Sequence, residues 1–374
     1  MNHVPGTAVA VGQAPGDHTD QPPAFTALTD LASRALGASV MAANDELFAQ
    51  RENLINPWEP AFDPAAFGHK GKVYDGWETR RRRDEGADWA IVHLGAPGRV
   101  RGVVVDTAWF RGNYPPHVSI EAVHAPGYPS VEDLLQANWT TLVPRSACAG
   151  DTKNYYAVEH DGRWTHVRLT IYPDGGVARL RVHGTVVADP DFLVGTIDLV
   201  AAENGGRLVE TSDAFYSSPA QIIMPGRARN MGEGWENARR RGPGNDFAIF
   251  ALAHPGTIQH LEVDTGYYVG NAPGAVRVRA LDARTLDPAG TAAPAGSADP
   301  TAAADPAGAV VAADDAAWVD ILARRPVQPD TRHRFLAERD LVATHVRLDV
   351  YPDGGLSRLR LWGVVEPRAL DVAR

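Results

Sequence analysis

An internal repeat is the sequence feature that most limits how this 374-residue chain can fold. The segment Asp75–Arg83 (DGWETRRRR) reappears as Glu233–Arg241 (EGWENARRR), 158 positions further along. Other short motifs follow in the same order in both copies: VDT at 105–107 and 263–265, GN at 112–113 and 270–271, HVRL at 166–169 and 345–348, and YPDGG at 172–176 and 351–355. A chain that repeats an ordered set of motifs in this way encodes one kind of domain twice.

Changes in the spacing between the copies mark two insertions. The offset falls from 168 upstream of the DGWE segments to 158 at them, so copy one carries ten additional residues within 58–72. It rises to 179 by Trp139 and Trp318, so copy two carries 21 additional residues within 282–317. That second stretch is rich in Ala, Gly, Pro, Asp and Thr and can bury little apolar surface, so we predict a flexible surface loop there.

The repeat also sets the predicted domain limits. Residues 1–26 are rich in Gly, Pro, Ala and polar residues, and we predict that they form a disordered extension. They lack the basic start and apolar stretch of a secretory signal peptide. The two repeats then occupy 27–188 and 196–366, separated near Asp189–Asp191, where a Pro between two Asp residues interrupts the strand pattern.

Alternation of polar and apolar residues predicts mostly strands. Trp164–Tyr172 alternates with period two, a Pro-Asp-Gly-Gly turn sequence follows, and 177–182 alternates again. We therefore predict a β-hairpin there and a twin hairpin at 346–361. Helical patterns are confined to Leu28–Leu36 and Ser130–Gln136. Many short strands with turn signals, present twice, predict an all-β protein with two tandem antiparallel β-sandwich domains.

Charge and composition narrow the classes of partner. The formal net charge is −10, so we expect no nucleic-acid partner and no anionic-membrane partner. The single cysteine, Cys148, permits neither an intramolecular disulfide nor a cysteine-based zinc site, and it favours a reducing compartment. We therefore expect a cytoplasmic protein. No apolar run reaches the roughly 18 residues that a membrane-spanning helix needs. A homo-oligomer is compatible with the sequence, which does not fix the oligomeric state.

The sequence identifies no cofactor. It contains no HExxH-like or cysteine-based metal signature, and its histidines are scattered. Acidic residues from distant loops can nevertheless converge on a divalent metal ion without leaving a spacing signal. Metal dependence is therefore left open at this point.

Taken together, the ordered motifs resemble those of the allantoicase family. The resemblance rests on the paired DGWE segments with their arginines, the paired VDT and GN segments and the paired YPDGG segments, and it runs from about Leu28 to Val365. It implies two jelly-roll domains of the galactose-binding type. It also implies a hydrolase of linear amidines that converts allantoate and water to ureidoglycolate and urea in purine (allantoin) degradation. Composition and spacing alone indicate only a duplicated β-sandwich protein, and they leave open a non-catalytic tandem module that binds a small ligand.

The DGWE segments supply the candidate acid and base for that reaction. Expelling urea needs a proton donor at the leaving nitrogen, and adding water needs a base. We predict Glu78 and Asp75 for these roles in copy one, with Glu236 and Glu233 in copy two. Neighbouring arginines would lower the pKa of these carboxylates and favour the base role. A structural role, in which the carboxylates neutralise those arginines, stays open.

The same segments supply candidate substrate-binding groups. Arginine offers a bidentate donor that suits the carboxylate of allantoate, so we predict contacts from Arg81, Arg82, Arg239 and Arg240. On a strand, alternate members of each run face opposite ways. The sequence leaves open whether one copy is catalytic, whether both are, or whether both contribute to one cleft.

Two further repeated pairs follow strands and are predicted to bind the ureido groups. They are Asp106 with Asp264 and Asn113 with Asn271. Loops at strand ends often carry binding residues, and carboxylate and amide oxygens accept hydrogen bonds from ureido N–H groups. Each of these residues could instead close a turn.

Other repeated polar residues are interpreted as structural. His166 and His345 lie inside regular strands, where a packed side chain is the expected state. Arg179 and Arg358 follow the predicted hairpin turns, and we expect them on solvated or salt-bridged faces.

Overall fold

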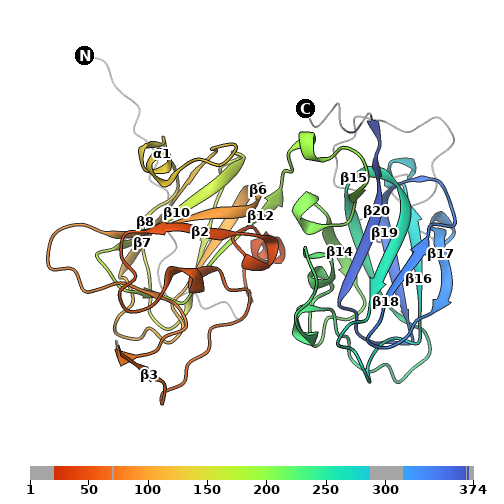
Figure 1. Cartoon of the computed structure of the whole chain (residues 1–374), viewed down its shortest axis with the longest axis horizontal. Helices are drawn as coiled ribbons and strands as arrows, with labels where there is room; N and C mark the ends of the chain where they lie inside the picture. Colours follow the sequence, from red (N-terminus) through yellow and green to blue (C-terminus); the bar gives the residue numbers. More distant parts are fainter. Residues whose placement is uncertain (1–20, 70, 287–314, 368, 370–374) are drawn as a thin grey trace. The chain divides into compact units, whose positions relative to one another are not determined.

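The computed structural model divides into two units, Met1–Thr185 and Val186–Arg374 (Figure 1). The residues whose structure is described are 21–69, 71–286, 315–367 and 369. Both units are built almost entirely of antiparallel strands, and each contains an eight-stranded sheet with the same order of strands. The predicted all-β fold class with an internal duplication is confirmed.

Unit 1 is organised around one long strand, β6. The strands of this unit are β1 (Thr29–Asp30), β2 (Ser39–Ala43), β3 (Phe67–Gly68), β4 (Gly71–Lys72), β5 (Trp77–Glu78), β6 (Asp88–Asp106), β7 (His117–Val123), β8 (Thr140–Ala147), β9 (Lys153–Ala157), β10 (Trp164–Tyr172), β11 (Gly176–Val177) and β12 (Arg179–Val186). The main sheet has the order β1-β12-β6-β10-β7-β8, and β2 and β9 also pair with β6. The start of β6 pairs with β10 and its end pairs with β9, so this one strand takes part in both halves of the sandwich.

Unit 2 repeats this arrangement around β15. Its strands are β13 (Ile197–Asp198), β14 (Arg207–Thr211), β15 (Asp246–Asp264), β16 (Ala275–Leu281), β17 (Val319–Pro326), β18 (Arg332–Leu336), β19 (Val342–Tyr351) and β20 (Arg358–Val365). The order β13-β20-β15-β19-β16-β17 matches that of unit 1 strand for strand. The start of β15 pairs with β14 and β19, and its end pairs with β18 and β20.

The helical segments within the described part of the chain are short. They are η1 (Ala24–Ala27), η2 (Arg34–Leu36), η3 (Arg51–Ile55), α1 (Val131–Gln136), η4 (Pro190–Phe192), η5 (Ala202–Asn204), η6 (Pro219–Ile223), η7 (Met231–Glu233), η8 (Ala283–Thr285) and η9 (Asp315–Ala317). The predicted helix at Ser130–Gln136 is confirmed as α1, which begins at a capping box between Ser130 and Asp133. No helix among the described residues is long and apolar enough to cross a membrane.

The predicted helix at Leu28–Leu36 is wrong. Thr29 and Asp30 form strand β1 and pair with β12, and only the last three residues of the segment form the 3-10 helix η2. The Asp30 carboxylate accepts hydrogen bonds from the backbone N–H groups of Ala32 and Val182. Tertiary pairing with a strand about 150 residues away therefore overrides the local apolar pattern.

The predicted hairpins are also wrong. The segments that were expected to pair are β10 with β12 and β19 with β20, but β6 lies between the first two strands and β15 between the second two. The Pro-Asp-Gly-Gly sequence turns the chain, yet the two flanking strands belong to opposite sides of the long central strand. Turn residues set the local backbone direction and do not choose the strand partner.

The two predicted disordered segments fall largely outside the described residues. Residues 1–20 and 287–314 are not described, and the predictions made for them stay predictions. The predicted N-terminal extension reached residue 26, whereas η1 already begins at Ala24. Phe25 explains the difference, since its ring packs 6.4 Å from the ring of Tyr155 and 6.1 Å from that of His183. The ends of the second insertion form η8 and η9.

The core of each unit includes the tryptophan of its DGWE segment. Trp77 and Trp235 are both 0% exposed and are the largest fully buried side chains. Their indole N–H groups donate to the backbone carbonyls of Asp45 and Asp213, at 2.7 and 2.9 Å. Burial of the tryptophan fixes the carboxylate residue that follows it in each copy.

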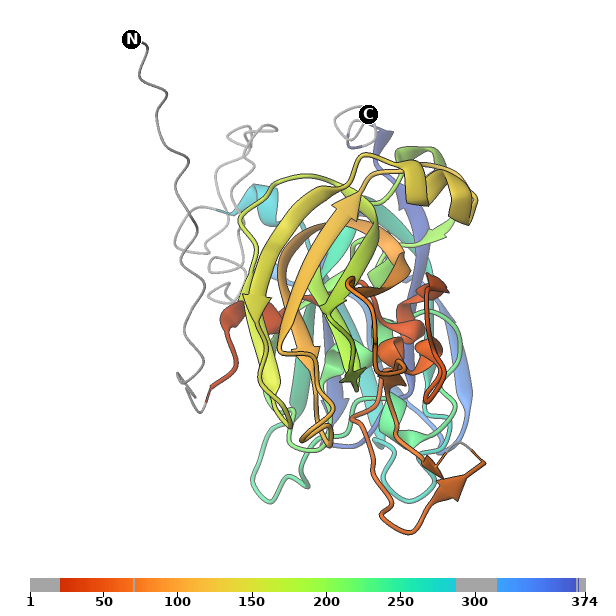
Figure 2. The ribbon, with the colours of Figure 1, turned by 90° about the vertical axis from the view of Figure 1, so that its left-hand side faces the viewer.

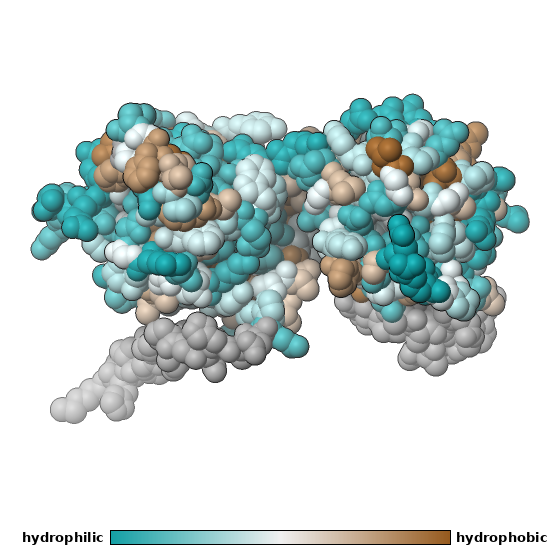
Figure 3. Space-filling view, turned by 90° about the horizontal axis from the view of Figure 1, so that it is seen from below, coloured by the Kyte–Doolittle hydropathy of each residue, from teal (hydrophilic) through white to brown (hydrophobic). Residues whose placement is uncertain are grey.

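On the face seen in Figure 3, hydrophilic and apolar residues are interspersed on both units.

Candidate active site

The DGWE segment of unit 1 lies in a small strand arrangement beside the main sheet. Glu78 pairs with Gly176 of β11 on one side and forms an isolated bridge with Ala49 on the other. In unit 2 an isolated bridge between Trp235 and Leu356 stands where unit 1 pairs Trp77 with Val177. The glycines of the YPDGG segment are needed here, because a Cβ on Gly176 would lie 2.1 Å from the ring of Phe110.

The structure brings together two of the predicted site residues in each unit. Asn113 Nδ2 donates a hydrogen bond of 2.6 Å to Glu78 Oε1, and Asn271 Nδ2 donates one of 2.7 Å to Glu236 Oε1. Each asparagine is held by its own backbone, since its carbonyl accepts a 2.7 Å bond from the second glycine of the YPDGG segment. All four side chains are half-buried. The same carboxylate–amide pair is therefore conserved between the two copies.

Burial changes the acid strength expected for Glu78. Desolvation raises the pKa of this carboxyl above its usual value, and the hydrogen bond from Asn113 partly opposes the shift. We expected the neighbouring arginines to lower it, and this expectation is wrong for Glu78. A carboxyl group with a raised pKa keeps its proton to higher pH and suits the role of general acid.

Unit 2 contains a buried tyrosine hydroxyl, that of Tyr268, near Glu236, which the shared motifs do not predict. Tyr268 stands where unit 1 has Phe110, and both side chains are almost fully buried. The Tyr268 hydroxyl donates to the Met231 carbonyl at 2.8 Å. Burial, and to a lesser degree the negative charge of Glu236, raise the Tyr268 pKa. Aligning the residue three positions after Thr107 and Thr265 would reveal only that an aromatic residue is kept, not that its hydroxyl lies near Glu236.

The predicted catalytic residue Asp75 has a structural partner. Its Oδ2 atom lies 2.7 Å from Arg179 Nη2 and accepts a 3.0 Å hydrogen bond from the backbone of Ala61. The Arg179 side chain is 1% exposed, so Asp75 neutralises a buried guanidinium. The sequence predicts a solvated or a salt-bridged face for Arg179. The structure shows the salt-bridged state, with the side chain buried rather than solvated. A catalytic role for Asp75 stays a prediction.

The counterpart in unit 2 is bonded differently. Glu233 accepts hydrogen bonds from the backbone and side chain of Arg229, at 2.8 and 2.6 Å. Arg358 is buried and donates instead to the backbone carbonyls of Gly226 and Glu233, at 3.0 and 2.7 Å. The change from Asp75 to Glu233 therefore redirects the carboxylate from the buried arginine to an exposed one.

The arginine runs separate into buried and exposed members. Arg82 Nη1 lies 2.6 Å from Asp88 Oδ1 at the start of β6, and Arg240 forms the equivalent ion pair with Asp246 at the start of β15. Both aspartates are buried, so these arginines have a structural function at the strand ends. Two other predicted substrate-binding residues are exposed: Arg81 and Arg239.

The aspartates after the long strands close turns. Asp106 Oδ1 accepts from the backbone of Ala108, and Asp264 Oδ1 accepts from that of Gly266, each at 2.8 Å. Both aspartates are buried, and burial raises the pKa of Asp106. This is the turn arrangement that the sequence left open beside a binding role. Their binding role stays a prediction.

Comparisons with known proteins show the family to which this chain belongs. A sequence model described as "Allantoicase repeat" matches residues 29–187 and 197–366, which together span most of the chain. The chain belongs to the allantoicase family. Among its relatives, a "Probable allantoicase" of Nocardia farcinica is 49% identical over 346 residues, covering 91% of this chain and 96% of the relative. An "Allantoicase" of Dictyostelium discoideum is 40% identical, covering 89% and 86%.

A solved allantoicase shares the fold. The crystal structure of the Saccharomyces cerevisiae allantoicase superposes with a TM-score of 0.71 at 31% identity, covering 90% of this chain and 92% of that one. The predicted class of two tandem jelly-roll β-sandwiches is therefore confirmed, as is the resemblance to allantoicases. In the part of the chain that the structure describes, no three His, Cys, Asp or Glu residues cluster so as to hold a metal ion.

Proposed function

We propose that this member of the allantoicase family hydrolyses allantoate to ureidoglycolate and urea at the Glu78–Asn113 and Glu236–Asn271 pairs. The observation that carries the site assignment is the half-buried Glu78 carboxyl, whose pKa is raised and whose Oε1 is bonded to Asn113 at 2.6 Å. Relatives named allantoicase, which match nearly the whole chain, support the reaction.

The proposed reaction has two steps with one acid–base residue. Glu78 donates its proton to the nitrogen of the departing ureido group, the C–N bond breaks, and the bonding electrons leave with urea. The lone pair of the other ureido nitrogen stabilises the carbon as an imine-type intermediate. Water then adds to that carbon and gives a proton back to Glu78, which restores the enzyme.

Asn113 positions this acid. Its amide N–H holds Glu78 Oε1, which leaves Oε2 to carry the proton toward the substrate. Its amide oxygen can accept a hydrogen bond from a ureido N–H group. Asn271 and Glu236 are proposed to do the same in unit 2.

The substrate carboxylate is proposed to bind the exposed arginines that follow each carboxylate residue. Arg81 and Arg239 are exposed, whereas Arg82 and Arg240 are already paired with buried aspartates. An exposed guanidinium can offer two parallel N–H groups to a carboxylate without first breaking an internal ion pair. Secondary candidates are the remaining predicted site residues: Asp75, Glu233, Asp106 and Asp264.

The proposal also covers the domains, the cellular location and the oligomeric state of the protein. We propose that the repeats at 27–188 and 196–366 are its two functional domains, that it is cytoplasmic, and that it forms a homo-oligomer. Its one cysteine and acidic charge suit a reducing compartment without nucleic-acid or membrane partners. Cell fractionation and light scattering of the purified protein test the last two points.

The deciding experiment follows urea and ureidoglycolate together after purified protein is mixed with allantoate, with and without a chelator. We expect equimolar formation of both products. A requirement for a divalent metal ion would appear as loss of turnover in the chelator arm. Folded protein that binds allantoate without turnover would contradict the hydrolase proposal and support the alternative, a non-catalytic tandem binding module.

A further inference from the structure

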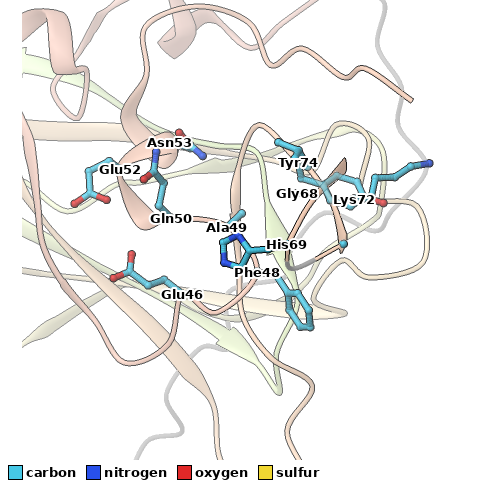
Figure 4. Close-up of a pocket in the computed structure, with 12 residues that line it drawn as sticks. Glu46, Phe48, Ala49, Gln50, Glu52, Asn53, Gly68, His69, Lys72 and Tyr74 are labelled. Atoms are coloured by element: carbon cyan, nitrogen blue, oxygen red, sulfur yellow. The ribbon is translucent and has the colours of Figure 1, made fainter. Parts of the chain in front are cut away.

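A cavity of about 530 Å³ lies in unit 1 beside the Glu78 strand. Figure 4 shows the Glu46 and Glu52 carboxylates on one side of it, His69 near its centre and the Lys72 ammonium directed away on the other side. The lining residues come from two segments, which are 46–53 and 68–74. A volume of this size lies within the range of small-molecule sites, about 300–1,000 Å³.

The wall made by 68–69 and 71–74 belongs largely to the insertion that only copy one carries. Its β3–β4 ribbon extends outward from the sandwich in Figure 2, where unit 1 faces the viewer. At the positions of Glu46 and Gln50, copy two has Ala214 and Ser218, so it lacks the carboxylate and the side-chain amide of these lining residues. The cavity is therefore a feature in which the two copies differ.

The insertion is held firmly against the rest of unit 1. The carbonyl of Trp58 accepts a 3.1 Å bond from the buried Arg179, and the backbone N–H of Ala61 bonds to Asp75. The ring of Phe62 stacks between two other rings, 5.3 Å from that of Tyr74 and 5.6 Å from that of Trp109. These contacts give the cavity a defined wall.

The cavity is adjacent to the proposed acid. Ala49 lines it and exchanges two backbone hydrogen bonds of 3.2 Å with Glu78. Residues directly opposite one another in an antiparallel pair project to the same face. The Glu78 and Ala49 side chains therefore project to the same face of this pair, and Glu78 lies next to the cavity without being one of its lining residues. Tyr74, another lining residue, stacks 4.9 Å from Phe110, whose ring touches the strand partner of Glu78.

The lining suits a small polar acid that carries planar groups. Among the described residues, the side chains of His69 and Gln50 have no hydrogen-bond partner, so both are available to a ligand. The Glu46 and Glu52 carboxylates share Arg51, at 3.2 and 3.3 Å. The second Glu46 oxygen accepts from the Arg51 backbone N–H at 3.1 Å, and the second Glu52 oxygen can accept from an N–H group of a ligand. The ring of Phe48 offers a face to a planar group, whereas the Tyr74 ring is stacked on both Phe62 and Phe110. Lys72 lines the rim, with its ammonium over the rings of Phe62 and Phe67, at 5.2 and 5.7 Å.

We propose that this cavity is the substrate pocket of unit 1. It takes a small ureido acid, whose planar ureido groups direct their N–H bonds toward Gln50, His69 and the carboxylates of Glu46 and Glu52. The inference rests on the proposed hydrolysis of allantoate and deepens it by assigning most of the substrate affinity and turnover to unit 1, with the Glu236–Asn271 pair of unit 2 contributing the smaller part. The insertion then has a function, because it builds the wall that makes this site selective.

The test compares cavity variants with a matched variant in unit 2. His69→Ala and Phe48→Ala remove cavity contacts, and Ala49→Phe fills the cavity while keeping the backbone pairing with Glu78. Tyr216→Ala changes the residue equivalent to Phe48 in unit 2 and is the control. We expect KM for allantoate to rise at least fivefold in the first two variants, kcat/KM to fall at least tenfold in Ala49→Phe, and Tyr216→Ala to stay within twofold of wild type.

Wild-type kinetics and calorimetric titration with allantoate separate this proposal from the proposed function. Turnover by wild type, with all three cavity variants folded and within twofold of it, would overturn the pocket and leave the hydrolase intact. Binding without turnover, abolished by Ala49→Phe, would support the pocket and contradict the hydrolase. No binding by wild type would overturn both. Thermal melting of each variant confirms that it is folded.

Discussion

Asn113 and Glu78 lie 35 residues apart in the chain and form a 2.6 Å hydrogen bond between the side-chain amide and the carboxylate. Asn271 and Glu236 form the same bond in the second unit, at 2.7 Å. Each pair joins the DGWE segment to the loop that follows the longest strand of its unit. The two motifs that are most distinctive in the sequence therefore meet in one place.

Replacing the carboxylates one at a time should show which unit carries the chemistry. We expect Glu78→Gln to lower kcat about 10²- to 10⁴-fold, because the amide cannot donate a proton as the acid does. Glu236→Gln should have the smaller effect if unit 1 holds the substrate. Steady-state assays of urea release measure both. Equal losses would show that the two units contribute equally, and an unchanged rate in Glu78→Gln would remove Glu78 from the mechanism.

Asn113 should control the pH at which activity is lost. Its hydrogen bond lowers the pKa of Glu78 against the larger raising effect of burial. An acid works only while protonated, so kcat/KM should fall as pH rises through this pKa. In Asn113→Ala the opposing bond is gone, the pKa is higher still, and the falling limb should move to higher pH. A pH profile in which the limb moves to lower pH would contradict the assignment of Glu78 as acid.

Asp75 should matter more for stability than Glu233 does. Asp75→Asn leaves the buried Arg179 without its counter-charge, and we expect a loss of about 2–3 kcal/mol in the stability of unit 1. Glu233→Gln affects a pair whose arginine is 59% exposed, so its cost should stay below about 1 kcal/mol. Hydrogen exchange of each unit measures the two effects separately. Equal small losses would show that Asp75 is not needed to neutralise Arg179.

The buried histidine pair of unit 1 should make that unit sensitive to mild acid. The rings of His93 and His166 lie 4.8 Å apart, and burial lowers the pKa of both, that of His166 to about 4. In the unfolded chain the imidazole of His166 takes up a proton near pH 6.5, whereas in the folded protein it stays neutral until about pH 4. The neutral histidine therefore costs the folded state nothing above pH 6.5, and the free energy of unfolding decreases as pH falls from 6.5 toward 4.

For His166 alone the slope should approach 1.4 kcal/mol per pH unit within that window. Denaturant unfolding of unit 1 at several pH values gives the slope in the wild type. The control is His166→Gln, which removes the titrating group and should flatten the dependence. A slope that is the same in both proteins would show that other groups are responsible.

The sequence by itself determined the duplication, the all-β class and the residue types at the site. Repeated motifs and period-two alternation are local signals, and a strand records along its own length which side chains face inward. This is why Trp164–Tyr172 was predicted with the bounds of β10, and why Glu78 and Asn113 were identified as candidates.

Only the tertiary structure decided which of these residues meet. The predicted hairpins failed because β6 and β15 separate the strands, and a turn sequence holds no information about a partner strand elsewhere in the chain. Asp75 became a partner of Arg179, 104 residues away, and Arg82 a partner of a buried aspartate. The raised pKa of Glu78 and the cavity beside it likewise arise from burial by distant segments, because desolvation depends on three-dimensional packing rather than on neighbours in sequence.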